Sequence, residues 1–457
     1  MTVTESIQVL LEQFGDRATL NSDVRDRHGR DESFHASAPP DLVVFPGSND
    51  EVASIVKQCA DSDTPVIPFG VGTSLEGHVA ALHGGVCVDL SMMNGVLEIN
   101  PADLDVRVQA GVTRKQLNAE LARHGLFFPV DPGADATLGG MVATGASGTN
   151  AVRYGTMREN ILGLTVVMPS GETVQTGGRA RKSSSGYDLT RLFCGSEGTL
   201  GVITEVRLKV YGLPEAHSAG VCSFKTLEGA VDSVINVIQM GIPVARVEFL
   251  DEVQVRAVNA YSKLSYAELP TLFFEFHGTE ASVIEQSESV AEIIVEYGGS
   301  EFLWSTKQEE QNQLWQARHD AYYASMALRP GTSGWPTDVC VPISRLTECI
   351  RQTRADAEES GVIAPIVGHV GDGNFHLLLL VDTDNPGEMA TAKGINDRLV
   401  KRAINMGGTA TGEHGVGYGK LPYMGLEHGA SLDLMRKVKL SFDPKNIMNP
   451  GKVVDIG

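Results

Sequence analysis

The chain has 457 residues, which is too long for a single compact hydrophobic core, so we expect two or three domains. The formal net charge of −20 disfavours nucleic-acid binding, because a phosphate backbone requires a basic surface. No apolar run approaches the roughly 18 residues of a membrane span, and the first residues resemble neither a secretory nor an organelle-targeting signal, so we expect a cytoplasmic protein, at most peripheral at the inner membrane.

The first half of the chain predicts a mixed α+β domain over residues 1–214. Ser48 and Thr113 are the expected N-caps of its two longest helices. In chain order, the pattern predicts a strand at 41–46, a helix at 51–59, strands at 65–68, 86–90 and 106–109, a helix at 114–123, and a hairpin of strands 164–168 and 172–175.

After residue 214, strand-like and helix-like segments alternate. They fall at residues 220–224, 227–240, 245–249, 272–277 and 283–297. This order suits helices packed on one face of an antiparallel sheet. We expect a second domain over residues 215–425. The six cysteines show no CxxC spacing and are expected to be reduced core thiols.

Glycine-rich loops are the first sign of a ligand. Residues 68–74 follow a predicted strand and can turn backbone N–H groups toward an anion such as a pyrophosphate. The loop fits neither the P-loop nor the dinucleotide fingerprint, which argues against ATP and NAD. Two further runs, at 131–148 and 195–203, suit a long ligand that is touched along its length. Plain tight turns are the alternative for each loop.

A histidine pair marks a candidate metal site at residues 365–380. Asp-Gly is a preferred two-residue hairpin loop, so residues 372–373 are the expected turn. In that register His369 faces His376, with Cβ atoms about 5 Å apart. Two imidazoles at this separation can bind one divalent ion.

Residues 412–417 hold the third candidate ligand. Glu413 can complete a set of two histidines and one carboxylate that leaves coordination positions open for a substrate. Its neighbour His414 is then a candidate base. A solvated loop pair is the alternative for both residues.

The three glycine-rich loops resemble those of the flavoprotein family that includes vanillyl-alcohol oxidase, p-cresol methylhydroxylase and the D-lactate dehydrogenases. The segments at 368–376, 412–415 and 449–452 extend the resemblance from about residue 30 to the C-terminus. It implies an α+β fold with a two-subdomain FAD-binding domain, an antiparallel-sheet (ferredoxin-like) substrate and cap domain, and a short C-terminal helical return at 426–457. It also implies FAD held without a covalent bond, although His78 is a candidate for attachment. The implied FAD contacts are Pro68, Gly70, Val71, Gly72, Thr73, Ser74, Pro132, Gly133, Thr137, Gly139, Gly140, Ala143, Gly145, Ser147, Glu197, Gly198, Gly201, Val202, Ile203 and Asn449.

The resemblance also implies roles for the second half of the chain. In the family's hydroxy-acid branch the residues matching His369, His376 and Glu413 bind a divalent metal, here expected to be Zn or Mn, and the one matching His414 is the catalytic base. Arg318, at a WxxR position of the family, is expected to pair with the substrate carboxylate. Substrate contacts are expected from Arg318, from both metal-binding histidines and from His414. The substrate hydride is expected to pass to the flavin.

The departures from family relatives narrow the substrate. Leu378 and residues 334–337 stand where D-2-hydroxyglutarate dehydrogenases carry an asparagine and a lysine, so a second carboxylate would lack a partner. We therefore expect oxidation of a small D-2-hydroxy acid, D-lactate first, with glycolate and D-2-hydroxyglutarate as alternatives.

Further assignments stay open from the sequence. The resemblance suggests cytochrome c or a quinone as the electron acceptor, and the oligomeric state stays open, with a homodimer as one candidate. A flavin-free metallohydrolase and a non-redox flavin transferase are alternatives from other classes. The alkyl-dihydroxyacetone-phosphate synthases are such transferases, but the run of adjacent histidines that they carry is missing from this sequence.

Overall fold

The computed structural model describes residues 2–456, which form two compact units. Unit 1 combines the residues up to Ser147 with Gly155–Leu213 and everything from Glu413 onward, and unit 2 combines Gly148–Tyr154 with Pro214–Gly412. The predicted second domain extends to residue 425, whereas the second compact unit ends at Gly412. Among the described residues, no helix is long and apolar enough to cross a membrane.

Unit 1 contains three sheets. Its strands are β1 (Ala18–Thr19), β2 (Leu42–Val44), β3 (Val66–Phe69), β4 (Val86–Asp89), β5 (Val96–Asn100), β6 (Asp105–Gln109), β7 (Leu126–Phe127), β8 (Ile161–Val167), β9 (Thr173–Gly177), β10 (Val202–Lys209) and β11 (Tyr211–Gly212). Its α-helices are α1 (Val3–Phe14), α2 (Ser22–His28), α3 (Asn49–Asp61), α4 (Arg114–Ala122), α5 (Leu138–Thr144), α7 (Met157–Asn160), α8 (Leu189–Phe193), α16 (Leu421–His428) and α17 (Ser431–Phe442).

The strand pairing of unit 1 follows its hydrophobic pattern. One sheet has the order β1-β2-β4-β3, in which β2 and β3 run parallel to β4. Every residue of β2 and β4 is buried, as expected for strands that are covered on both faces. A five-stranded antiparallel sheet has the order β5-β6-β10-β8-β9, and β11 pairs with β7.

Both predicted N-caps of unit 1 are confirmed. The Ser48 hydroxyl accepts a hydrogen bond from the Glu51 amide at 3.3 Å, and the Thr113 hydroxyl accepts one from the Gln116 amide at 3.2 Å. These bonds satisfy amides that have no partner inside the helix. The cap positions fix where α3 and α4 begin.

Unit 2 is built on one large sheet. Its strands are β12 (Ala216–Ser223), β13 (Val244–Leu250), β14 (Thr271–Gly278), β15 (Leu303–Ser305), β16 (Ser333–Pro336), β17 (Val339–Cys340), β18 (Ile366–His369) and β19 (Asn374–Val381). Its α-helices are α6 (Ala151–Tyr154), α9 (Leu227–Gln239), α10 (Glu252–Ser262), α11 (Glu280–Glu296), α12 (Gln308–His319), α13 (Ala321–Leu328), α14 (Leu346–Ser360) and α15 (Pro386–Asn405). The antiparallel strand order is β15-β12-β14-β13-β18-β19-β16, with β17 also paired to β19.

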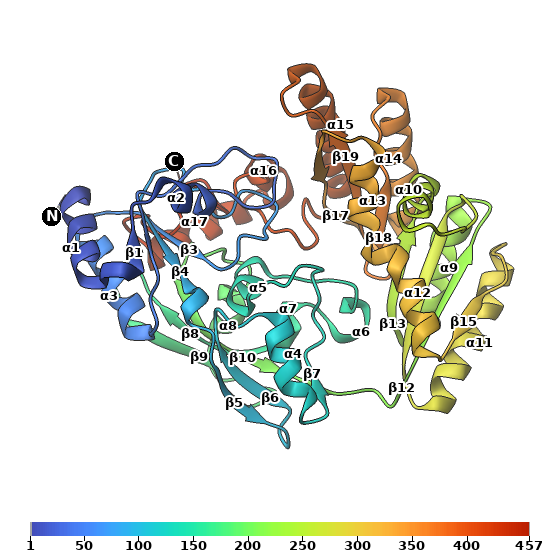
Figure 1. The fold of residues 1–457 in the computed structure, drawn as a ribbon, viewed down its shortest axis with the longest axis horizontal. Coiled ribbons are helices and arrows are strands. Elements are labelled where there is room, and N and C mark those ends of the chain that lie inside the picture. Colours follow the sequence, from blue (N-terminus) through green and yellow to red (C-terminus); the bar gives the residue numbers. More distant parts are fainter. Residues whose placement is uncertain (1, 457) are drawn as a thin grey trace. The chain divides into compact units, whose positions relative to one another are not determined.

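Helices cover both faces of this sheet, so the expectation of helices on one face is wrong. On one face Phe273 packs with Trp315 of α12 and with residues of α10 and α13. On the other face Ser218 bonds Ser287 of α11, which lies beside α9 (Figure 1). The reason is the sequence of β14, in which Phe273 and Phe274 point to opposite faces and both are buried.

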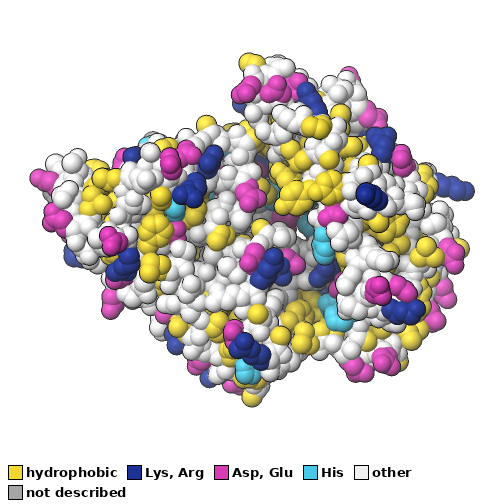
Figure 2. Space-filling model, viewed as in Figure 1, with side chains coloured by type: hydrophobic (Ala, Val, Ile, Leu, Met, Phe, Trp, Pro, Cys, Tyr) yellow, Lys and Arg dark blue, Asp and Glu magenta, His cyan; other side chains and the backbone are white. Residues whose placement is uncertain are grey.

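Charged side chains of both signs lie on the face of the molecule that Figure 2 shows. Acidic side chains are spread over this face and mixed with lysine and arginine. The six cysteines are free thiols, and five of them are buried, as expected for reduced core residues.

Candidate functional site

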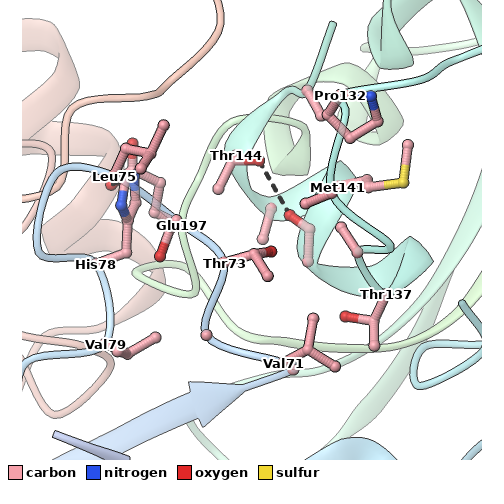
Figure 3. A pocket seen from close by; sticks show the side chains of 18 of the residues that line it. Val71, Thr73, Leu75, His78, Val79, Pro132, Thr137, Met141, Thr144 and Glu197 are labelled. Carbon is pink, nitrogen blue, oxygen red and sulfur yellow. Dashed lines mark hydrogen bonds and ion pairs between the residues drawn. The ribbon is translucent and has the colours of Figure 1, made fainter. Parts of the chain in front are cut away.

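A pocket in unit 1 is walled by the three glycine-rich loops. Its empty volume is about 1000 Å³, counting the part that is open to solvent. Figure 3 shows side chains from the loop after β3 and from the segment around α5 along this pocket, with His78 near Glu197 at one end. The predicted cofactor residues on its wall are Pro68, Gly70, Val71, Gly72, Thr73, Ser74, Pro132, Thr137, Gly140, Ala143, Ser147, Glu197, Gly198 and Asn449. Glu413 and His414 also lie on this wall.

The glycines of the wall keep main chain exposed to a ligand. A Cβ atom on Gly70 would lie 2.3 Å from the Thr137 hydroxyl oxygen, so the loop after β3 and the start of α5 are in close contact. Gly72 has a φ of +70°, which favours glycine. Such a wall lets main-chain N–H groups approach a phosphate closely. The residues present therefore fit a long phosphate-containing cofactor such as FAD.

Six of the predicted cofactor residues are absent from this wall, and for five of them the structure shows a packing or backbone role. The six are Gly133, Gly139, Gly145, Gly201, Val202 and Ile203. A Cβ on Gly139 would lie 2.5 Å from the Ala110 Cβ, and one on Gly201 would lie 2.8 Å from a Val167 oxygen, so both permit close packing. Gly145 ends α5 in the left-handed conformation, and Val202 and Ile203 are buried in β10.

His78 is an ion-paired residue of the pocket wall. Its Nε2 lies 3.4 Å from Glu197 Oε2 and its Nδ1 lies 3.8 Å from Asp31 Oδ2. Burial opposes the charge on the ring, but the carboxylates of Glu197 and Asp31 outweigh it and raise the His78 pKa to about 10. The sequence alone named His78 only as a candidate for flavin attachment and missed both carboxylate partners.

Glu197 also holds the segment that follows His414. Its carboxylate accepts hydrogen bonds from the Val416 amide at 2.6 Å and the Gly417 amide at 2.8 Å. The side-chain amide of Asn449 donates to the main-chain oxygens of His78 and Glu197, at 3.0 and 2.8 Å. Segments far apart in the sequence are thereby fixed around one end of the pocket, which positions His414.

The histidine hairpin of unit 2 forms with a different register from the predicted one. His369 pairs with Asn374, and Val367 pairs with His376, so the loop between β18 and β19 has four residues rather than two. The predicted direct pairing of His369 with His376 is therefore wrong. Because the shift is two residues, both side chains stay on one face as diagonal neighbours. Their ring centroids lie 5.5 Å apart.

Both rings are oriented by hydrogen bonds in which Nδ1 is the donor. Glu248 Oε1 lies 2.6 Å from the Nδ1 of His369, and the Thr337 main-chain oxygen lies 2.9 Å from the Nδ1 of His376. A carboxylate and a carbonyl oxygen can only accept, so Nδ1 carries the proton in each ring and Nε2 carries the lone pair. Metal-binding histidines show this arrangement, because the outer acceptor fixes the tautomer and the ring orientation. The two Nε2 atoms fit a divalent metal such as Zn²⁺.

Arg318 belongs to the same network. Its Nε donates to Glu248 Oε2 at 2.6 Å, so Glu248 joins the arginine to His369. Glu248 is fully buried; burial opposes its charge, but His369 and Arg318 outweigh this and hold its pKa below the ordinary value. A guanidinium held through Nε presents its terminal nitrogens as a fork that matches a carboxylate.

Glu248 is the main residue that sequence reasoning missed. The available signal was a carboxylate inside the strand Val244–Leu250, where every neighbour along the chain from Val247 to Leu250 is apolar. A charge at such a position is rarely buried without a partner. Its partners lie 70 and 121 residues away, so the sequence could not identify them.

Comparison with known proteins assigns the chain to a family. The family model "FAD binding domain" matches residues 40–177, and "FAD linked oxidases, C-terminal domain" matches residues 213–453. The structure of p-cresol methylhydroxylase with substrate bound has a TM-score of 0.82 at 17% identity, over 99% of this chain and 97% of that one. This likeness shows the fold, an α+β FAD-binding domain followed by a domain with a large antiparallel sheet.

Three curated relatives share most of their length with the chain. The "Probable D-lactate dehydrogenase, mitochondrial" of Danio rerio is 52% identical over 96% of this chain and 89% of its own. The "D-lactate dehydrogenase (cytochrome), mitochondrial" of Arabidopsis thaliana is 45% identical over 96% and 78%. The "D-lactate dehydrogenase (cytochrome) 1, mitochondrial" of Saccharomyces cerevisiae is 41% identical over 99% and 80%.

The relatives correct one expectation and settle the family. All three are named as mitochondrial proteins, which contradicts the expected cytoplasmic location. The agreement of both family models, of the fold and of these relatives over nearly the whole chain leaves a single assignment. The chain belongs to the FAD-dependent D-lactate dehydrogenases of the vanillyl-alcohol oxidase and p-cresol methylhydroxylase flavoprotein family, which are oxidoreductases.

Proposed function

We propose that this chain oxidises D-lactate to pyruvate with non-covalent FAD and one divalent metal, and passes the electrons to cytochrome c. The observation that carries the proposal is the joint orientation of Arg318 and His369 by one buried carboxylate, Glu248. A carboxylate-binding fork and a metal-binding imidazole held side by side suit a 2-hydroxy acid, whose carboxylate and hydroxyl are neighbours. Two relatives are named as cytochrome-linked D-lactate dehydrogenases, which supports this substrate and acceptor.

The proposed metal ligands are His369, His376 and Glu413. Nδ1 carries the proton in each ring, so Nε2 is the proposed ligand atom of both histidines. Gly412 lies so close to the hairpin that a Cβ on it would be 2.3 Å from the Asn374 side-chain nitrogen. Glu413 follows Gly412 directly, so their Cα atoms lie about 3.8 Å apart, and this proximity in the chain supports Glu413 as the third ligand.

The proposed reaction divides the work among the chain's own residues. Arg318 binds the substrate carboxylate and fixes which face of Cα is presented. His414 accepts the hydroxyl proton, and its placement on the pocket wall supports this role. When bound, the metal supplies Lewis acidity that lowers the hydroxyl pKa, and FAD supplies the acceptor for the Cα hydrogen.

The size of the proposed substrate follows from the residues around His376. Leu378, two residues along β19, is buried and pairs with Pro336 of β16. These apolar side chains offer no partner to a second carboxylate, whose burial would be costly. A small monocarboxylate is therefore preferred over D-2-hydroxyglutarate, and glycolate is the smaller alternative.

The test is an anaerobic titration of the FAD-loaded protein, followed by the visible absorption of the flavin. D-lactate is expected to bleach the flavin, and L-lactate, glycolate and D-2-hydroxyglutarate are expected to do so at least tenfold more slowly. Arg318→Lys is the matched variant, because it keeps the charge but not the fork, and its apparent affinity for D-lactate should fall. Equal bleaching by both lactate isomers, or faster bleaching by another acid, would refute the substrate assignment.

A second experiment tests the proposed metal. Removal of metal with a chelator should abolish bleaching by D-lactate, and addition of Zn²⁺ or Mn²⁺ should restore it. His376→Ala should not respond to added metal. Full bleaching by metal-free protein would contradict the metal-dependent part of the proposal and leave the flavin part intact.

A further inference from the structure

A second cluster of metal-ligand side chains lies in unit 2, apart from His369 and His376. His217 of β12 pairs directly with His277 of β14, and Glu275 lies two residues before His277 on the same face. One ligand atom from each of the three residues lies within 4.8 Å of the others. The His277 Nε2 is 2.6 Å from Glu275 Oε1, and the two imidazole centroids are 4.5 Å apart.

The cluster is largely shielded from solvent. Glu275 is 7% exposed and His277 is 3% exposed, while His217 is half-buried. The burial of Glu275 and His277 indicates that they have polar partners, because removal of an unpartnered polar side chain from water is costly. Two imidazoles and one carboxylate on two adjacent strands form a ligand set that can coordinate Zn²⁺ and similar divalent ions.

The surroundings of the cluster resemble the outer shell of a metal site. The Tyr154 hydroxyl lies 2.8 Å from the Nδ1 of His277. When a metal replaces the proton on Nε2, that proton can move to Nδ1 and be donated to Tyr154, so His277 binds as a neutral ring.

A metal ion bound at this cluster would lie near the positive charge of Arg246. Its Nε is 3.6 Å from Glu275 Oε1, and its guanidinium lies 5.2 Å from the Trp315 ring centroid. Asn150 accepts a further hydrogen bond from the same Nε at 2.8 Å. The arginine is thus held by Asn150 and Trp315 as well as by Glu275, and it offsets the charge of Glu275 without contributing a ligand.

We propose that His217, Glu275 and His277 form a second divalent-metal site, selective for Zn²⁺-like ions, that joins β12 to β14. The site does not depend on the metal proposed at His369 and His376. A hydrogen-bonded histidine–glutamate pair without a metal is the alternative arrangement of the same residues.

The test counts metal ions per chain in the FAD-loaded protein. The protein is stripped with a chelator, incubated with Zn²⁺, passed over a desalting column and measured by elemental analysis. His376→Ala removes the first proposed site, and His217→Ala or the isosteric Glu275→Gln removes a ligand of the second. We expect two Zn²⁺ in the wild type, one in each single variant, and none in His376→Ala/His217→Ala.

The outcomes separate the two proposals. If His376→Ala retains one Zn²⁺ and either cluster variant in that background loses it, the second site is supported. If His376→Ala binds none, or if both cluster variants bind as many ions as their parent, the second site is refuted. A wild type with one Zn²⁺ that His376→Ala keeps and the cluster variants lose would support the second site and refute the first. Circular dichroism confirms that each variant is folded.

Discussion

Replacement of Glu248 by glutamine tests how the buried carboxylate organises the site. Glu248 accepts from His369 Nδ1 and from Arg318 Nε, each at 2.6 Å. Glutamine has the same shape but only one acceptor oxygen, so its NH₂ group must face one of these two donors. One donor loses its partner, and the negative charge disappears from a side chain with no solvent exposure.

Two independent estimates of the effect agree. A hydrogen bond to a charged group contributes about 1.5–3 kcal/mol. Loss of the outer partner of a metal-binding histidine lowers metal affinity by about 10- to 100-fold, which corresponds to about 1.4–2.8 kcal/mol. We therefore expect Glu248→Gln to weaken Zn²⁺ binding at His369 and His376 by about 10- to 100-fold, and to lower kcat/KM for D-lactate by at least as much.

The assay is competition for Zn²⁺ with a chromophoric chelator, together with steady-state kinetics on D-lactate. The matched control is Asp356→Asn, which removes a carboxylate that pairs with Arg402 and Arg398 in the same unit. This control should leave the metal affinity within about twofold of the wild type. Unchanged metal binding in Glu248→Gln, or an equal loss in the control, would refute the reasoning.

Three further predictions concern stability and the pocket. Gly373→Ala should lower the free energy of unfolding by more than about 3 kcal/mol, because Gly373 has a φ of +81° and a Cβ there would lie 2.1 Å from a main-chain oxygen. The control is Gly361→Ala, since Gly361 has a φ of +67° but open space around it. This control should cost only about 1 kcal/mol in the same urea unfolding experiment. Burial raises the pKa of Asp251 from its ordinary value of 3.8 to about 7. Its contribution to the free energy of unfolding is therefore complete below pH 3.8 and is lost as the pH rises through 7, by up to about 4 kcal/mol. Asp251→Asn should flatten the measured dependence of stability on pH between these values. Glu197→Gln should lower kcat for D-lactate by about tenfold, since one of its two charge-assisted bonds to the segment after His414 is lost, and unchanged kcat with bound FAD would contradict this positioning role.

The order of helices and strands could be predicted because it depends on local pattern. The buried strand Leu42–Val44, the cap at Ser48 and the hairpin of β8 and β9 all follow from neighbouring residues. The side of the sheet that helices cover in unit 2 could not be predicted in the same way. It depends on β14, whose aromatic residues are buried on both faces, and an alternating strand pattern does not describe such a strand.

The hairpin of His369 and His376 shows which part of a site prediction tolerates error. The predicted two-residue loop placed the histidines directly opposite each other, and the structure has four loop residues, because the Asp372 amide bonds the His369 oxygen at 3.0 Å. A shift of one residue would have sent one ring to the opposite face. A shift of two kept both rings on one face, so the pairing was wrong and the juxtaposition was retained.

The roles of glycine were harder to separate from the sequence. Gly139 and Gly140 are adjacent, yet Gly140 lies on the pocket wall and Gly139 packs against Ala110. Both functions require the absence of a side chain, so the residue type alone does not distinguish them. The direction in which a Cβ would point decides between ligand contact and packing. That direction depends on the folded backbone.

Glu248 shows the limit of motif reasoning most clearly, since the motif residues depend on a residue outside every motif. His369 and Arg318 were recognised by their sequence context, but the geometry that makes them useful comes from one carboxylate on β13 that holds both. Along the same sheet face, the β13–β14 pairing brings Arg246 opposite Glu275 and continues to His277 and His217. Charged and imidazole side chains thus follow one face of the unit 2 sheet across four strands, β12, β14, β13 and β18. A search for titratable residues at inward positions of apolar strands would have found both Glu248 and the cluster around Glu275, because burial of such residues requires compensating partners.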